Sequence, residues 1–162
     1  MQSLLLSAAT LLIALSISAQ QTVQRPKLVV GIVVDQMRWD YLYRFYERYD
    51  KDGGFKRMLN QGFTCENTLI PYAPTVTACG HSSIYTGSVP SINGITGNFW
   101  RDNEQMRSVY CTEDKTVNTV GSSSSLGKMS PYNLQTTTIA DELRLATNFK
   151  SKVVGIAIKD RG

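Results

Sequence analysis

The chain has 162 residues, of which 42% are apolar and 19% are charged. This composition is typical of a globular protein with a hydrophobic core, and it excludes an intrinsically disordered chain, a coiled coil and a collagen. Seventeen Lys and Arg residues oppose thirteen Asp and Glu residues, a net charge of +4. The basic residues are scattered along the chain, so nucleic acid is not expected as a partner.

Residues 1–19 are predicted to be a signal peptide. Residues 4–17 are almost entirely Leu, Ile, Ala and Ser, a stretch too short for a stable membrane span. Ser16, Ser18 and Ala19 supply the small residues of a cleavage site. We therefore expect export and a periplasmic location, with residues 20–162 as the mature part. The alternative is a buried N-terminal helix or an uncleaved anchor.

The mature part predicts an α/β fold with a mostly parallel sheet flanked by helices. Its first apolar run is rich in Val and Ile, as in a strand buried on both faces of a parallel sheet. Helices are indicated by aromatic residues at helical spacing and by acidic residues that follow a threonine. In chain order we predict a strand at 28–34, helices at 39–49 and 55–60, a strand at 63–69, a helix at 78–86, an irregular segment or small hairpin within 101–128, a helix at 138–148 and a strand at 152–158.

Three cysteines follow the predicted signal peptide, at Cys65, Cys79 and Cys111. Export permits disulfides, but an odd number leaves at least one thiol unpaired within the chain. No Cys-x-x-Cys or Cys/His spacing typical of a metal site is present.

Several polar residues fall where predicted strands end or helices begin, the edge at which α/β sheets bind ligands. Asp35 follows the first strand, Thr77 precedes a helix, and Lys159 and Arg161 follow the last strand. An acid, a hydroxyl, two cations and a helix N-terminus would suit a phosphate group and a metal ion. Each residue also has a simpler interpretation: Asp35 or Thr77 as a helix N-cap, Asn98 as a turn residue, and the two cations as solvated surface charges.

Three segments together resemble a known family: residues 33–38 (VVDQMR), 73–81 (APTVTACGH) and 85–98 (YTGSVPSINGITGN). They look like the alkaline phosphatase superfamily, and most closely like bacterial periplasmic alkaline phosphatases with a threonine nucleophile. These enzymes are related to type I phosphodiesterases and nucleotide pyrophosphatases. The resemblance covers nearly all of residues 27–162, and the ordered set of motifs is far more specific than any one of them.

The resemblance implies hydrolysis of small phosphate monoesters at a site with two zinc ions. Thr77 matches the nucleophile, which also contacts zinc and becomes transiently phosphorylated. Asp35 matches a carboxylate ligand of zinc, and Asn98 matches the asparagine that donates a hydrogen bond to a phosphate oxygen. Lys159 and Arg161 match the Lys-x-Arg pair of the monoesterase branch.

The chemistry explains these residue types. Zinc lowers the pKa of a hydroxyl that is otherwise a poor nucleophile, and a second zinc stabilises the leaving oxygen. Two cations suit a monoester, which carries more oxygen charge than a diester. On strand geometry, Lys159 and Arg161 would face one side and Asp160 the other. His81 follows Thr77 by one helical turn, and the resemblance implies a structural role for it, because the matching histidine of the family is not a zinc ligand.

Two zinc sites need about three protein ligands each, but the sequence contains a single histidine. We therefore expect residues 20–162 to be the N-terminal part of a longer catalytic domain, incomplete at its C-terminus. By itself this chain is expected neither to bind two zinc ions nor to turn over substrate. Two alternatives stay open for the whole protein: a phosphodiesterase or nucleotide pyrophosphatase, and a noncatalytic α/β module that binds an anion or a partner.

Overall fold

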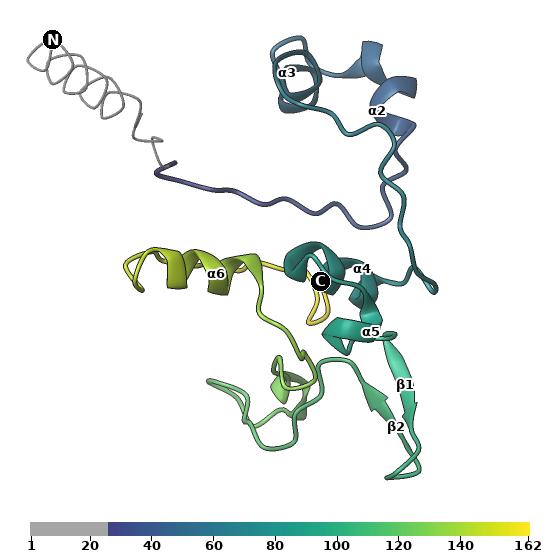
Figure 1. The fold of residues 1–162 in the computed structure, drawn as a ribbon, viewed down its shortest axis with the longest axis vertical. Coiled ribbons are helices and arrows are strands. Elements are labelled where there is room, and N and C mark those ends of the chain that lie inside the picture. Colours follow the sequence, from purple (N-terminus) through teal and green to yellow (C-terminus); the bar gives the residue numbers. More distant parts are fainter. Residues whose placement is uncertain (1–25) are drawn as a thin grey trace, which may run out of the picture. The chain divides into compact units, whose positions relative to one another are not determined.

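The computed structural model describes residues 26–162, so the predicted signal peptide lies outside the described residues. Every helix and strand described belongs to one compact unit, residues 33–162 (Figure 1). In chain order the elements are α2 (Tyr41–Arg44), η1 (Tyr46–Arg48), α3 (Gly54–Gln61), α4 (Thr77–Thr86), α5 (Pro90–Asn93), β1 (Phe99–Asp102), β2 (Arg107–Tyr110), η2 (Ser125–Gly127) and α6 (Ile139–Ala146).

The aromatic segment after residue 38 is helical but broken. Instead of one helix over 39–49, it forms α2 and then η1, because Phe45 leaves the helical backbone at φ −106° and ψ 12°. The helix predicted at 55–60 is confirmed as α3, which begins after Gly53 and ends at Gly62. The Tyr46 hydroxyl donates a hydrogen bond to Asn60 Oδ1 at 3.0 Å, so the aromatic residues tie these helices together.

Helix α4 is the element that the sequence predicts best. It ends at Gly87, whose φ of +65° is the left-handed conformation that glycine adopts without strain. Helix α5 follows at once, with Pro90 at its first position and Gly94, at φ +85°, after its last. The fully buried Asn93 fixes this turn, because its Oδ1 accepts the Ile95 N–H at 2.9 Å.

The hairpin β1–β2 and helix α6 also follow the predictions. The two strands pair antiparallel, with Phe99 opposite Tyr110, and the rest of residues 101–128 is irregular apart from η2. Helix α6 begins with a capping box, in which Thr138 Oγ1 accepts the Asp141 N–H and the Asp141 carboxylate accepts the Thr138 N–H. A small core joins α4 to this region: Ala78, Ile95 and Cys111 are buried, with Trp100, Tyr110 and Leu134 packed against them.

The three predicted strands at 28–34, 63–69 and 152–158 are not formed. The one sheet within residues 26–162 is the two-stranded β1–β2. An apolar run predicts that a segment is buried, but a strand exists only where a second strand takes up its N–H and C=O groups. No described segment pairs with any of these three as a strand, and apolar side chains in them stay exposed, with Val154 81% and Ile156 94% exposed.

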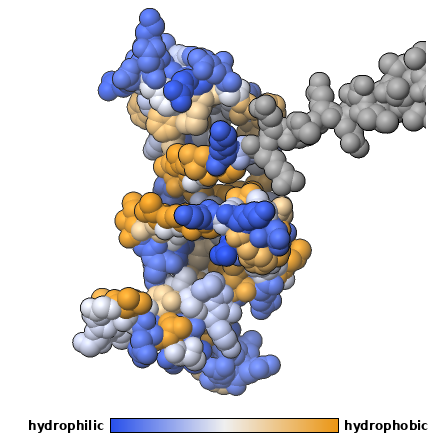
Figure 2. Space-filling view, turned by 90° about the vertical axis from the view of Figure 1, so that its left-hand side faces the viewer, coloured by the Kyte–Doolittle hydropathy of each residue, from blue (hydrophilic) through white to orange (hydrophobic). Residues whose placement is uncertain are grey.

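Figure 2 shows hydrophobic residues exposed on the face of the molecule that it draws.

All three thiols are free, with Cys65 exposed and Cys79 and Cys111 buried. Burial raises the pKa of the Cys79 and Cys111 thiols above their usual value.

Among residues 26–162, no helix combines the length and the hydropathy needed to cross a bilayer.

Candidate active site

Thr77 is the first residue of α4, so its hydroxyl lies at the start of this helix. The N-cap is Val76, in extended conformation, so the interpretation of Thr77 as a helix cap is wrong. The Thr77 hydroxyl instead donates a hydrogen bond to Asp35 Oδ2 at 3.2 Å. A hydroxyl at a helix N-terminus lies at the positive end of the helix dipole, which favours negative charge on a bound group.

Asp35 and Lys159 meet at this hydroxyl. Lys159 Nζ donates to Asp35 Oδ2 at 3.0 Å and to Thr77 Oγ1 at 3.5 Å. Asp35 caps no helix, because the N-cap position of α2 is Asp40. The Lys159 ammonium, followed by the Thr77 hydroxyl, holds the pKa of the Asp35 carboxyl below its usual value. The three side chains thus bring together an ionised acid, a hydroxyl and a cation.

Asn98 approaches the same helix end from the residue before β1. Its Oδ1 accepts the N–H of Ala78, the neighbour of Thr77, at 3.0 Å. Its backbone carbonyl accepts the Cys111 N–H at 3.0 Å, which places it on the hairpin. The Asn98 Nδ2 amide group is a donor, and no described residue accepts a hydrogen bond from it. The Asn98 side chain therefore contacts the first turn of α4.

Arg161 is held apart from these contacts. Its Nη1 donates to the Tyr110 hydroxyl at 2.8 Å, and no hydrogen bond joins it to Asp35, Thr77 or Asn98 in the described part of the chain. Asp160 contacts the same Tyr110 hydroxyl at 2.8 Å. The prediction that Asp160 faces away from Arg161 is wrong, because residues 158–161 form a bend and turn in which strand alternation does not apply.

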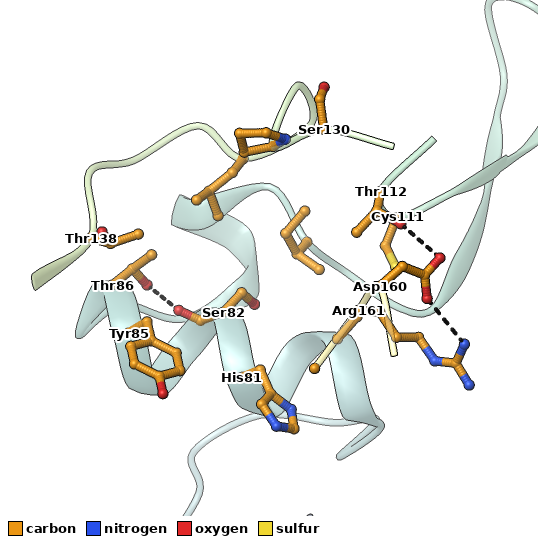
Figure 3. Close-up of a pocket in the computed structure, with 15 residues that line it drawn as sticks. His81, Ser82, Tyr85, Thr86, Cys111, Thr112, Ser130, Thr138, Asp160 and Arg161 are labelled. Carbon is orange, nitrogen blue, oxygen red and sulfur yellow. Dashed lines mark hydrogen bonds and ion pairs between the residues drawn. The ribbon is translucent and has the colours of Figure 1, made fainter. Parts of the chain in front are cut away.

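A pocket of about 250 Å³ opens beside α4 (Figure 3). His81 and Ser82 of α4 line one side, while Thr112, Asp160 and Arg161 line the other (Figure 3). The His81 Nδ1–H donates to the backbone carbonyl of Thr77 at 2.9 Å, which agrees with the structural role expected for it.

The oxygens of Asp35 and Thr77 are arranged to hold positive charge, since both contact the single cationic atom Lys159 Nζ. A carboxylate and a hydroxyl oxygen fit part of a zinc coordination sphere. They do not complete one: residues 26–162 contain no group of three or more His, Cys, Asp or Glu side chains that could hold a metal ion. The described residues therefore fit a partial metal site.

Tyr110 and Thr112 were not anticipated as site residues. Tyr110 lies 51 residues before Arg161 at the end of β2, and Thr112 donates to Asp160 Oδ2 at 3.3 Å across 48 residues. A tyrosine and a threonine in a polar, irregular segment carry no local pattern that distinguishes them. Only the folding of the hairpin against residues 159–162 identifies them.

Comparison with known proteins shows which family this chain resembles in sequence. A model of the type I phosphodiesterase / nucleotide pyrophosphatase family matches residues 29–158. Alkaline phosphatase PhoV of Synechococcus elongatus is 72% identical over 88% of this chain and 26% of its own length. Alkaline phosphatase PafA of Elizabethkingia meningoseptica is 64% identical over 90% of this chain and 27% of its own. A Myroides odoratus protein named calcium-transporting ATPase is 56% identical over 99% of this chain and 29% of its own.

Solved structures of PafA match the backbone as well. The wild-type crystal structure gives a TM-score of 0.83 at 64% identity, covering 87% of this chain and 27% of that chain. A PafA variant with a threonine, an asparagine, a lysine and an arginine substituted gives the same TM-score at 61% identity. The predicted fold class, an alkaline-phosphatase-like α/β fold, is confirmed, and the chain spans about a quarter of the length of these relatives. Because the family model covers most of the sequence, the chain belongs to the type I phosphodiesterase / nucleotide pyrophosphatase family.

Proposed function

We propose that the whole protein containing this chain is an alkaline phosphatase that hydrolyses small phosphate monoesters through Thr77. The observation that carries the proposal is the meeting of Thr77 Oγ1, Asp35 Oδ2 and Lys159 Nζ within 3.5 Å at the start of α4. Two relatives named alkaline phosphatases support the same activity. Export to the periplasm belongs to the proposal and rests on the sequence of residues 1–19.

The residues substituted in the PafA variant support the assignment of roles. They are a threonine, an asparagine, a lysine and an arginine in this order, with the same spacing within the Thr–Asn pair and within the Lys–Arg pair as Thr77/Asn98 and Lys159/Arg161. We assign Thr77 as nucleophile and Asn98, Lys159 and Arg161 as phosphate-binding residues.

Each side chain has a distinct task in this proposal. The Thr77 hydroxyl must lose its proton to attack phosphorus, and its hydrogen bond points that proton at the ionised Asp35 carboxylate. Asn98 offers its amide donor to a phosphate oxygen without adding charge, while Lys159 supplies a point charge and Arg161 a two-pronged donor. Asp35 and Thr77 would be the zinc ligands from this chain, and bound zinc would lower the hydroxyl pKa.

The nucleophile assignment is tested with Thr77→Ala and Thr77→Ser in the full-length protein. Loss of the hydroxyl is expected to lower kcat for an aryl phosphate monoester by about 1,000-fold or more, whereas serine keeps part of the activity. Thr96→Ala is the matched control, because Thr96 is exposed and its hydroxyl makes no hydrogen bond among the described residues. Full activity of Thr77→Ala would instead favour the noncatalytic module.

The family description leaves a diesterase as the second candidate. A monoester dianion carries more oxygen charge than a diester, so removal of two cations should affect the monoester more. The double variant Lys159→Ala/Arg161→Ala is therefore expected to lose monoester hydrolysis far more than diester hydrolysis, measured as kcat/KM for an aryl monoester and an aryl diester. Equal losses on both substrates would contradict the monoesterase assignment.

A further inference from the structure

One hydroxyl links both charged residues that follow Lys159. The Tyr110 hydroxyl accepts a hydrogen bond from Arg161 Nη1 at 2.8 Å and donates to Asp160 Oδ1 at 2.8 Å. Thr112 Oγ1 donates to the other carboxylate oxygen at 3.3 Å. The direct ion pair between Arg161 Nη1 and Asp160 Oδ1 is longer, at 3.8 Å. Tyr110 therefore stands between the two charges and takes hydrogen bonds that they could otherwise exchange.

Tyr110 is well suited to anchor a neighbour, because the hairpin fixes its ring. The ring packs on Phe99 of the paired strand, with centroids 4.7 Å apart, and contacts the core around Ala78 and Cys111. Its backbone N–H is also held, by Glu113 Oε2 at 3.2 Å. Residues 158–162, in contrast, have no regular secondary structure. The fixed partner in this contact is the tyrosine, and the positioned one is the arginine.

The guanidinium keeps donors for a ligand after Tyr110 has taken one. Arginine carries five N–H groups in a planar fork, and the Tyr110 contact occupies one on Nη1. Arg161 Nε is shielded from solvent and has no hydrogen-bond partner among the described residues. A shielded donor without an acceptor is costly, which favours a site whose acceptor is an external oxygen. Burial raises the pKa of the Tyr110 hydroxyl, so it stays protonated at neutral pH and can donate to Asp160.

We propose that Tyr110 is a positioning residue that orients the Arg161 guanidinium toward the phosphate and keeps Asp160 from neutralising it. This inference rests on the proposed function, in which Arg161 binds the phosphate group. Thr112 assists by occupying the second oxygen of Asp160. Without the Tyr110 hydroxyl, Asp160 loses its strongest neutral donor and pairs directly with Arg161, which draws the cation away from the substrate.

The test is a double-mutant cycle in the full-length protein with Tyr110→Phe, Arg161→Ala and the double variant. Phenylalanine keeps the ring that packs on Phe99 and removes only the hydroxyl. Tyr110→Phe is expected to lower kcat/KM for an aryl phosphate monoester about tenfold, the effect of one hydrogen bond to a charged group. It should leave an aryl diester nearly unchanged, and it should have no further effect once Arg161 is alanine.

Two further variants serve as a control for Tyr110→Phe and as a second test of the contact with Asp160. Tyr132→Phe is the matched control, since Tyr132 is 77% exposed and its hydroxyl makes no hydrogen bond in the described part of the chain. Thr112→Val removes the other donor to Asp160 and should produce a smaller loss of the same kind, again confined to the monoester. Thermal unfolding of each variant shows whether the loss of activity follows a loss of folded protein.

The outcomes separate this inference from the proposed function. If Thr77→Ala abolishes hydrolysis but Tyr110→Phe leaves the monoester rate unchanged, the positioning role is overturned and the proposed function stands. An equal loss with and without Arg161, or an equal loss on monoester and diester, also overturns it, because the tyrosine then acts by another route. If Thr77→Ala keeps full activity, the proposed function fails and this inference fails with it.

Discussion

At the scale of single residues, the site depends on contacts between side chains far apart in the chain. Asp35 and Lys159 form an ion pair across 124 residues, and Thr77 lies 42 residues from Asp35. Both partners of the ion pair are partly open to solvent, at 32% and 38% exposure, so the pair contributes little to stability. The ion pair matters for the geometry of the site, because it keeps an ionised carboxylate and a cation beside the Thr77 hydroxyl.

Asn98 offers a test that separates its structural contact from its proposed chemical one. Asn98→Asp keeps an oxygen that can accept the Ala78 N–H, but it replaces the amide donor with a carboxylate that repels phosphate. We expect the Tm of the full-length protein to change little and kcat/KM for an aryl monoester to fall by about tenfold or more.

Asn98→Ala, which removes both groups, should lower the Tm as well as the activity. If Asn98→Asp hydrolysed the monoester like the wild type, the amide would have no part in binding phosphate.

At the scale of elements, helix α6 begins with reciprocal hydrogen bonds that its sequence specifies. Asp141 Oδ2 accepts the Thr138 N–H at 2.8 Å, and Thr138 Oγ1 accepts the Asp141 N–H at 3.3 Å. These bonds satisfy backbone donors that no helical carbonyl reaches. The hydrogen bond from the Thr138 N–H, followed by that from its hydroxyl, holds the pKa of the Asp141 carboxyl below its usual value.

Removal of the cap should destabilise the full-length protein measurably. Thr138→Ala is expected to lower its free energy of unfolding by about 1 kcal/mol, whereas Thr138→Ser, which keeps the acceptor, should be close to wild type. Denaturant unfolding measures both. If alanine and serine gave the same stability, the capping contact would not contribute.

The same box predicts a pH dependence. Because folding lowers the Asp141 pKa, its contribution is present above the unfolded carboxyl pKa, about 3.9, and is lost as the pH falls through the lower folded value. The Tm difference between wild type and Asp141→Asn should therefore be largest near neutral pH and shrink in acid. A difference that stayed constant down to the acid limit of folding would contradict the assignment.

At the scale of the whole molecule, the main feature is that the apolar segments at 28–34 and 152–158 have no partner strand within residues 26–162. They have the composition of buried strands, yet Leu28 is 78% and Ile158 fully exposed. The part of this chain that matches PhoV covers 26% of that relative's length, and the matched part of PafA is 27% of that chain. Apolar strands of this kind are stable only when other strands pair with their edges and helices cover both faces of the sheet.

The 162-residue chain purified by itself should therefore lack the properties proposed for the whole protein. We expect strong binding of a hydrophobic dye, a tendency to self-associate, and no hydrolysis of an aryl monoester. Metal analysis should find fewer than two zinc ions per chain, because residues 26–162 hold no complete ligand set. Two bound zinc ions with turnover in this chain would refute the expectation.

Local patterns in the sequence predicted the elements that local interactions form. The helix ended by Gly87, the capping box at Thr138 and the hairpin all depend on neighbours within a few residues, and all are present. The helix over 39–49 was predicted too long, since aromatic spacing does not reveal the break at Phe45. The strands at 28–34, 63–69 and 152–158 were predicted but are not formed within residues 26–162, because a strand needs a partner strand and its own sequence does not identify that partner.

For the site, the sequence by itself determined the residue types and the family, because the motifs around Asp35, Thr77 and Asn98 occur in order and are specific together. The tertiary structure decided which side chains touch. It excluded the capping roles of Asp35 and Thr77, joined both to Lys159, and brought Tyr110 to Arg161. The physical reason is that hydrogen bonds and ion pairs act over a few ångströms in space, whereas these residues are separated by tens of positions along the chain.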